Sequence, residues 1–187
     1  MNNLEKFLYT PFGNNIIIGS HIKDQLTFLK KILPEDFRKR EMYDLGCGDG
    51  KVTILLTEIF QPKKVFACDI EESLIKKARK RGINAKVMNL EEEMPNGELA
   101  VMWGVLHHLK NPKEVLKRIK NNFQYFFLRE PLKKEGDNSK LNISNILELG
   151  KPFRKEEIKK ILDEIFENCE IFEYNGAIMM LWEKEEF

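Results

Sequence analysis

Apolar residues near the start of this chain follow a helical period. Residues 14–33 carry four of them at steps of four, three and four, namely Ile22, Leu26, Leu29 and Leu33. This spacing places the four side chains in one stripe along a helix. Pro34 follows directly and ends the helical region, because its ring disfavours a helical residue before it. The segment therefore predicts an amphipathic helix.

Short apolar runs then alternate with helical patterns. Five runs are typical of buried strands: residues 42–45, 65–68, 85–89, 99–103 and 123–128. Helical spacing lies in four further stretches: residues 52–60, 74–78, 112–119 and 155–167. Residues 91–96 predict a loop or a short helix that Pro95 stops. Strands that alternate with helices usually pair in parallel, so we expect a parallel sheet covered on both faces.

The end of the chain departs from this alternation. Residues 169–174 and 177–183 are two strand-like runs separated only by Asn175-Gly176. Asn-Gly between two such runs is the strongest short signal for a β-hairpin, whose strands are antiparallel. The pattern thus predicts an α/β fold with five parallel strands and a terminal antiparallel hairpin.

Composition narrows the classes of protein that fit. The chain has 187 residues, 42% apolar and 33% charged, which suits one globular domain. Lys and Arg total 31 against 30 for Asp and Glu, and this balance disfavours a dedicated nucleic-acid binder. Three cysteines, Cys47, Cys68 and Cys169, form no C-x-x-C pair, so we expect reduced thiols and no zinc site. Without a signal segment or membrane-spanning stretch, the expected location is the cytoplasm, and the expected state is a monomer.

A glycine-rich turn follows the first predicted strand. Residues 44–50 read Asp-Leu-Gly-Cys-Gly-Asp-Gly, and helical spacing begins directly afterwards. Such a turn lets a ligand approach the backbone closely, and the helix N-terminus favours a negative or acceptor group. The third glycine comes one residue too early for the dinucleotide fingerprint. A phosphate loop is also excluded, because Gly50-Lys51 is followed by Val52.

Polar residues end the next two strands. Asp69 follows the last glycine by about 20 residues, and a carboxylate there can accept both hydroxyls of a ribose. Asn89 ends the third predicted strand, where its amide can meet an adenine edge. Together with the turn they predict a nucleoside crevice. The alternative, a plain tight turn with Asp69 as a helix N-cap, explains each feature singly but not the set.

At these residues the chain resembles the class I S-adenosylmethionine-dependent methyltransferases, in their small-molecule branch. Their first motif, D/E-x-G-x-G-x-G, matches residues 44–50, and the likeness continues through residues 67–70, 89–90 and 103–109. The resemblance implies a Rossmann-like seven-stranded sheet in the order 3-2-1-4-5-7-6. It also implies S-adenosyl-L-methionine as the cofactor, which leaves as S-adenosyl-L-homocysteine.

The same resemblance implies one domain over residues 1–187. Residues 1–40 would form a helical cap or lid, residues 41–130 the cofactor-binding half, and residues 131–187 the substrate side with the hairpin.

The family's cofactor roles transfer to matching positions of this sequence. The methionine part would meet Asp44, Gly46, Cys47 and Gly48, and the ribose would meet Asp69. The adenine would meet Ile70, Asn89 and Leu90, and the sulfonium end would meet Trp103 and Gly104. Many relatives carry Asp where this chain has Asn89, which can still form hydrogen bonds.

Two of the three histidines, His107 and His108, follow the fourth predicted strand. Their loop resembles the L/C-H-D-W stretch of plant O-methyltransferases, in which the His is the base. This resemblance makes His107 the candidate base, and His108 stands where those enzymes have Asp. The alternative is that one histidine packs or caps the helix that begins near Asn111.

The sequence says less about which residues contact the methyl acceptor. The resemblance assigns substrate contacts to Tyr9, Phe12, His108 and Arg129. Packing on the core remains the alternative for the two aromatic residues, and an ordinary ion pair is the alternative for Arg129. Glu130 stands alone rather than in a carboxylate trio, so no metal is predicted.

Three readings of the function stay open. Amino-methylases typically carry D/N/S-P-P-Y/F/W after the fourth strand, whereas residues 104–107 read Gly-Val-Leu-His. We therefore expect O-, N- or C-methylation of a small molecule. RNA or protein methylation is the second reading, since basic residues crowd two predicted helices. A non-catalytic cofactor-binding scaffold or regulatory protein is the third.

Overall fold

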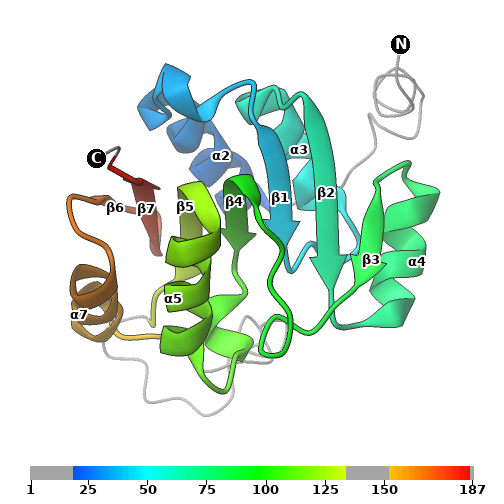
Figure 1. Ribbon diagram of the computed structural model, residues 1–187. Helices are drawn as coiled ribbons and strands as arrows, with labels where there is room; N and C mark the ends of the chain where they lie inside the picture. Colours follow the sequence, from blue (N-terminus) through cyan, green and yellow to red (C-terminus); the bar gives the residue numbers. More distant parts are fainter. Residues whose placement is uncertain (1–18, 134–151, 186–187) are drawn as a thin grey trace.

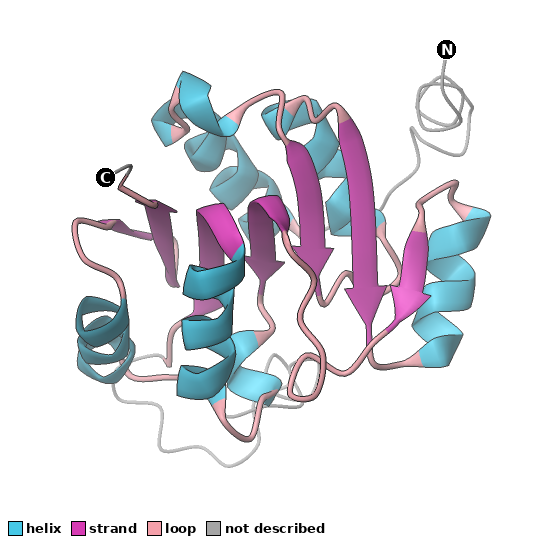
Figure 2. Cartoon of the chain, viewed as in Figure 1, coloured by secondary structure: helices cyan, strands magenta, loops and turns pink. Residues whose placement is uncertain are grey.

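The computed structural model describes residues 19–133 and 152–185. In these residues a seven-stranded sheet lies between two layers of helices (Figures 1 and 2). The strands are β1 (Glu41–Leu45), β2 (Lys64–Asp69), β3 (Ala85–Val87), β4 (Gly97–Trp103), β5 (Phe123–Pro131), β6 (Glu170–Tyr174) and β7 (Ala177–Glu183). The helices are α2 (Ser20–Ile32), α3 (Lys51–Phe60), α4 (Glu72–Lys80), α5 (Pro112–Asn122) and α7 (Lys155–Ile165), with the 3₁₀ turns η2 (Glu35–Phe37) and η3 (Leu106–His108).

The sheet order is β3-β2-β1-β4-β5-β7-β6. Strands β1 to β5 pair in parallel, and β7 runs antiparallel to both β5 and β6. The predicted sheet and its terminal hairpin are therefore confirmed. None of the helices in the described ranges is long and apolar enough to cross a membrane.

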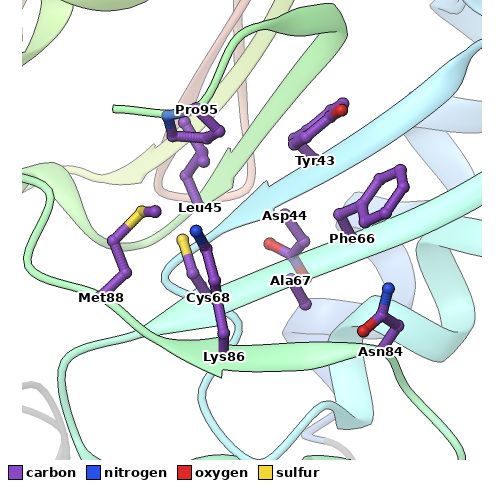
Figure 3. Close-up of a pocket in the computed structure, with 10 residues that line it drawn as sticks. All are labelled: Tyr43, Asp44, Leu45, Phe66, Ala67, Cys68, Asn84, Lys86, Met88 and Pro95. Atoms are coloured by element: carbon purple, nitrogen blue, oxygen red, sulfur yellow. The ribbon is translucent and has the colours of Figure 1, made fainter. Parts of the chain in front are cut away.

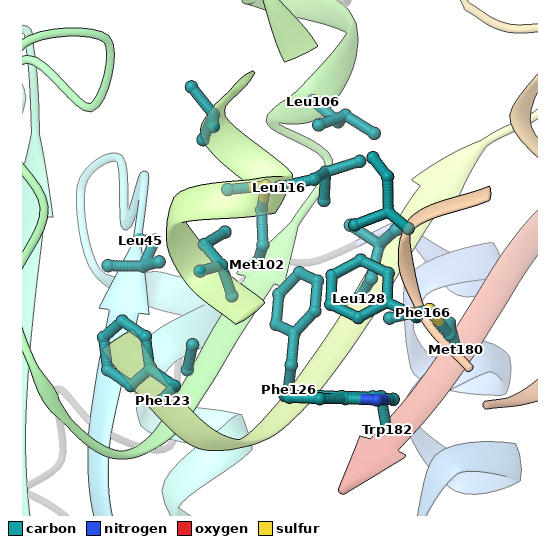
Figure 4. Close-up of a cluster of buried hydrophobic side chains, with 14 of the residues drawn as sticks. Leu45, Met102, Leu106, Leu116, Phe123, Phe126, Leu128, Phe166, Met180 and Trp182 are labelled. Atoms are coloured by element: carbon teal, nitrogen blue, oxygen red, sulfur yellow. The ribbon is translucent and has the colours of Figure 1, made fainter. Parts of the chain in front are cut away.

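Each face of the sheet has its own apolar core. On one face Leu29 of α2 and Phe60 of α3 are fully buried against strand residues such as Val101, and α4 continues this layer. On the other face Leu116 of α5 packs in a cluster that includes Phe126 (Figure 4). Because residues of a strand point alternately to the two faces, consecutive residues of β4 and β5 feed both cores.

Two predicted strands have different ends in the structure. The third stops at Val87 rather than at residue 89, because Asn89 accepts the backbone N–H of Glu91 at 3.0 Å and begins a turn. The fifth continues beyond residue 128 to Pro131, since β7 pairs with its whole length. The connector from β3 to β4 is a loop without a helix, one of the two forms expected for it.

The carboxyl ends of the parallel strands gather at one edge of the sheet. Residues that follow β1, β2 and β4 lie at this edge, and β5 ends there beside the hairpin turn. Ligands of open α/β sheets bind outside the carboxyl ends of the strands. The predicted site residues therefore lie where the fold can hold a ligand.

Candidate functional site

The glycine turn after β1 is anchored by its backbone. The N–H groups of Gly46 and Cys47 both donate to the carbonyl of Cys68, at 2.8 and 2.9 Å. Gly46 has φ +89°, and a Cβ there would lie 2.4 Å from Val105 Cγ2. Gly48 also has positive φ, but no atom lies within 4 Å of the place of its Cβ. The turn is thus closed against Val105 and open at Gly48, which leaves room for a ligand to reach the backbone.

Asp69 connects this turn to the end of β2. Its Oδ2 accepts the N–H of Gly48, and its Oδ1 accepts the N–H of Glu71, both at 2.9 Å. An ionised carboxylate offers about four lone-pair sites, so it can accept further donors such as ribose hydroxyls. The N-cap of α4 is Glu71, whose side chain accepts the Ser73 N–H. The alternative of Asp69 as the helix cap is therefore wrong.

An exposed apolar side chain lies beside this carboxylate. Ile70 is 67% exposed, which is unusual for a large aliphatic residue next to a core strand. A flat nucleobase that covered Ile70 would bury apolar surface while Asp69 met its sugar. The neighbouring Asp69 carboxylate, as a hydrogen-bond acceptor, and this apolar surface fit a nucleoside.

Asp44 lies beneath the turn and is buried. Burial raises its pKa to about 7, the hydrogen bond from the Thr53 hydroxyl opposes that rise, and the charge of Asp69 adds to it. A nearby cation would lower this raised pKa and favour the ionised carboxylate. The group therefore suits the ammonium end of an amino-acid ligand.

Asn89 and Leu90 follow the short strand β3. The Met88 N–H donates to the carbonyl of Asp69 at 3.0 Å, which brings this segment to the end of β2. Leu90 itself is buried in the core on the α5 side, and Arg118 donates to its carbonyl. Its side chain thus serves packing in the core.

His107 forms a buried pair with Glu130. Its Nδ1 lies 2.7 Å from Glu130 Oε2, and the two side chains are 1% and 0% exposed. The other oxygen of Glu130 accepts the N–H groups of Val105 and Leu106, at 2.7 and 2.6 Å. An ionised carboxylate can only accept, so Nδ1 is the donor and Nε2 of the neutral ring holds the lone pair. Nε2 is buried and has no hydrogen-bond partner among the described residues.

The contact of Glu130 with His107 was not predicted from the sequence. The sequence predicted only that Glu130 belongs to no carboxylate trio, whereas the structure pairs it, as the penultimate residue of β5, with His107. The available signal was a carboxylate two residues after an apolar run, at the edge that carries the histidines. Its partner is 23 residues away, so no local pattern reveals the pair.

Arg129 lies next to this pair and is 5% exposed. Its Nε donates to Gln25 Oε1 at 2.9 Å, and its guanidinium lies 5.3 Å from the ring centroid of Trp103. Its Nη1 is 3.4 Å from the place that a Cβ on Gly104 would take. The Arg129 side chain thus lies against two other predicted site residues, Trp103 and Gly104, and it is held by Gln25, a buried amide that was not predicted as a site residue.

The remaining predicted residues are less constrained. His108 is exposed, and its ring centroid lies 4.0 Å from that of His107. Tyr9 and Phe12 lie outside the described residues. Within the described ranges, no three side chains of His, Cys, Asp or Glu gather as metal ligands.

A family comparison decides the class of this chain. The sequence model of a methyltransferase domain matches residues 21–165, which is most of the chain. The chain belongs to the methyltransferase domain family. In this methyltransferase domain the matched region includes the glycine turn, Asp69 and the His107–Glu130 pair.

Curated relatives match part of this methyltransferase domain. Trans-aconitate 2-methyltransferase of Mycolicibacterium gilvum is 32% identical over 81 residues, 42% of this chain and 32% of that protein. Release factor glutamine methyltransferase of Dictyoglomus turgidum is 27% identical over 111 residues, 56% of this chain and 36% of that protein. The chain therefore spans about a third of the length of these relatives.

A solved structure shares the whole fold. It is a SAM-dependent methyltransferase from Thermotoga maritima, described as a possible histamine N-methyltransferase. The alignment covers 89% of each chain with a TM-score of 0.69 and 16% identity. At this identity the likeness supports the fold of the methyltransferase domain and not its acceptor.

Proposed function

We propose that this methyltransferase domain binds S-adenosylmethionine and transfers a methyl group to a small molecule. The observation that carries the proposal is the turn at Gly48, which is open on its outer side and whose N–H is held by the Asp69 carboxylate. The family match and the name of the Thermotoga maritima neighbour support it.

The residues of the site fit this cofactor in three places. Asp69 would accept the ribose hydroxyls, with Ile70 against the adenine and Asn89 at its amino edge. Gly46, Cys47 and Gly48 would line the methionine part, and Asp44 would attract its ammonium group. Trp103 and Gly104 would close the sulfonium end, and the Leu90 backbone would lie beside the adenine. When bound, S-adenosylmethionine supplies an electrophilic methyl group on a sulfonium.

The task of this chain is then to position and desolvate the acceptor, because the cofactor carries the activation. We propose His107 as the group that receives a proton from a neutral acceptor, through Nε2. Glu130 fixes the tautomer that leaves Nε2 as the acceptor. Arg129 and His108 would contact the acceptor, with Tyr9 and Phe12 on the side formed by residues 1–40.

The proposed acceptor is a small molecule, and the name of the trans-aconitate relative supports that class. Protein methylation is the second candidate, which the release factor relative favours. Residues 104–107, Gly-Val-Leu-His, oppose it, because they lack the Pro-Pro run typical of amino-methylases. A non-catalytic cofactor-binding protein is the third candidate.

The experiment uses the purified chain with methyl-labelled S-adenosylmethionine. Separate reactions contain trans-aconitate, a panel of small phenols, amines and carboxylic acids, a denatured protein extract, and total RNA. We expect label in a small molecule. Label in protein or RNA alone would replace the small-molecule proposal, and cofactor binding without any transfer would favour the scaffold.

The role of His107 has its own test. With an acceptor in hand, His107→Gln should lower kcat at least tenfold and flatten its pH dependence, since a positioned base contributes about a hundredfold or more. His21→Gln is the matched control, because His21 is an exposed histidine of α2 with no assigned role in the site, and it should change kcat less than threefold. An unchanged pH profile of kcat in His107→Gln would remove the base role and leave His107 as a loop support.

We further propose that the protein is a monomer in the cytoplasm and that residues 1–187 act as a single domain. The unpaired cysteines support the cytoplasmic location. Light scattering of the purified chain tests the monomer, and a mass of twice the chain would contradict it.

A further inference from the structure

The sheet is covered unevenly on the face that carries α5 and α7. No described helix lies over β1, β2 and β3 on this face, as Figure 1 shows. The connector between β3 and β4 consists of turns and coil. It borders the uncovered strands and leaves a hollow of about 270 Å³ between itself and the sheet.

The walls of this hollow combine aromatic, aliphatic and sulfur-containing side chains with the polar residues Asp44, Asn84 and Lys86 (Figure 3). Tyr43 and Phe66 form one wall, with ring centroids 4.9 Å apart and planes inclined by 24°. Met88 and Pro95 border it on the connector side. Flat aromatic faces and a thioether are favourable partners for an aromatic ring.

One cation lies over the hollow. Figure 3 shows Lys86 rising from β3 with its amine near Cys68. Within residues 19–133 and 152–185, no acidic group pairs with Lys86, whereas Lys64 of the neighbouring strand pairs with Glu41 at 2.8 Å. An anionic group on a ligand would therefore find, at the mouth of the hollow, an ammonium group that no carboxylate of the described residues pairs with.

The floor of the hollow is connected to the glycine turn. Cys68 lines the hollow with its side chain, and its carbonyl accepts the N–H groups of Gly46 and Cys47. Met88 also lines the hollow, and its N–H donates to the carbonyl of Asp69. A ligand in the hollow would touch residues that hold the edge of the sheet.

We propose that this hollow is a second ligand site for a small planar aromatic anion, beside the proposed cofactor crevice, with which it shares Asp44. The aromatic part lies between the ring wall and Met88, and the anionic group meets the ammonium of Lys86. Its volume is near the lower limit of roughly 300 Å³ for ligand pockets, which suits one or two fused rings. The site does not depend on which acceptor the enzyme methylates.

The test uses 2-naphthoate as the probe, with calorimetry on the full chain. The native protein should bind one naphthoate per chain, with or without saturating S-adenosylhomocysteine. Lys86→Glu should weaken binding at least fivefold. Lys77→Glu is the matched control, because it makes the same charge change at an exposed position of α4, on the other face of the sheet. The neutral probe 2-naphthamide should bind at least fivefold more weakly than naphthoate.

Methyl-labelled methionine locates the bound probe. The ε-methyl resonance of Met88, assigned through Met88→Leu, should shift most among the methionines on titration. The proposal is overturned if millimolar naphthoate does not bind, or if S-adenosylhomocysteine displaces it. It is equally overturned if Lys86→Glu binds like the native chain, if the amide binds as well as the acid, or if the Met88 resonance stays unchanged.

Discussion

The two sides of the candidate crevice are built differently. On one side the glycine turn uses backbone N–H groups and one partly exposed carboxylate, Asp69. On the other side His107, Glu130 and Arg129 are buried, and their contacts are between side chains or from a side chain to the backbone. The first side presents open groups to a ligand, whereas the second consists of polar groups that mostly bind one another.

This difference predicts that the first side mainly determines ligand binding and the second side mainly determines folding stability. Open groups such as the Asp69 carboxylate contribute through the ligand they bind, so their loss should weaken binding more than folding. Buried groups such as Glu130 form hydrogen bonds with neighbouring polar groups, so their loss leaves unpaired polar atoms inside the protein. Substitutions on the two sides should therefore affect different measurements.

The largest expected effect is on stability, at Glu130. Replacing Glu130 with Ala leaves His107 Nδ1 and the N–H groups of Val105 and Leu106 without their acceptor. We expect the free energy of unfolding to fall by about 3 to 5 kcal/mol, as for a broken buried pair. Urea unfolding followed by circular dichroism measures it.

The matched control for that change is Glu164→Ala. Glu164 pairs with Lys113 at the surface, and both side chains are about half exposed. Exposed pairs of this kind contribute about 0 to 1 kcal/mol. Equal losses of stability in the two variants would remove the distinction between the sides of the crevice.

The next effect is on binding, at Asp69. Asp69→Asn keeps the shape of the side chain but replaces a charged acceptor, and hydrogen bonds to charged groups contribute about 1.5 to 3 kcal/mol. We expect S-adenosylhomocysteine to bind at least tenfold more weakly. Asp49→Asn is the control, because Asp49 is occupied by Lys51 and Arg81. An Asp69→Asn protein with native affinity would show that this carboxylate does not meet the ribose.

The smallest effect is a pH dependence at Asp44. Its pKa rises from 3.8 in the unfolded chain to about 7 on burial, so the folded protein holds this proton more tightly. The resulting stabilisation is complete below about pH 4 and is lost as the pH rises through about 7. Between pH 6 and pH 7 the native chain should lose about 1 kcal/mol relative to Asp44→Asn. Parallel pH profiles of urea unfolding for the two proteins would contradict the assignment.

Much of the fold could be predicted because its signals are local. The period of residues 14–33 and the Asn175-Gly176 turn each specify one element from a few neighbouring residues. The ends of strands were harder, since they depend on partners elsewhere. β5 extends to Pro131 because β7 lies beside it, and β3 ends early because the Asn89 side chain turns the chain.

The same distinction applies to the site. The glycine turn and Asp69 belong to a short pattern with fixed spacing, which sequence alone can reveal. Glu130 is 23 residues from His107, and Gln25 is 104 residues from Arg129. These pairs exist only once the sheet has brought β4, β5 and α2 together, so no local period or motif encodes them.

The most direct test of the central claim is the binding of S-adenosylhomocysteine to the native chain, measured by calorimetry beside NAD. The crevice formed by Gly48, Asp69 and Ile70 should bind one S-adenosylhomocysteine per chain, with micromolar affinity or tighter, and should give no heat with NAD. Absence of heat with S-adenosylhomocysteine, or equal binding of NAD, would contradict the assignment of this crevice to the methyl donor.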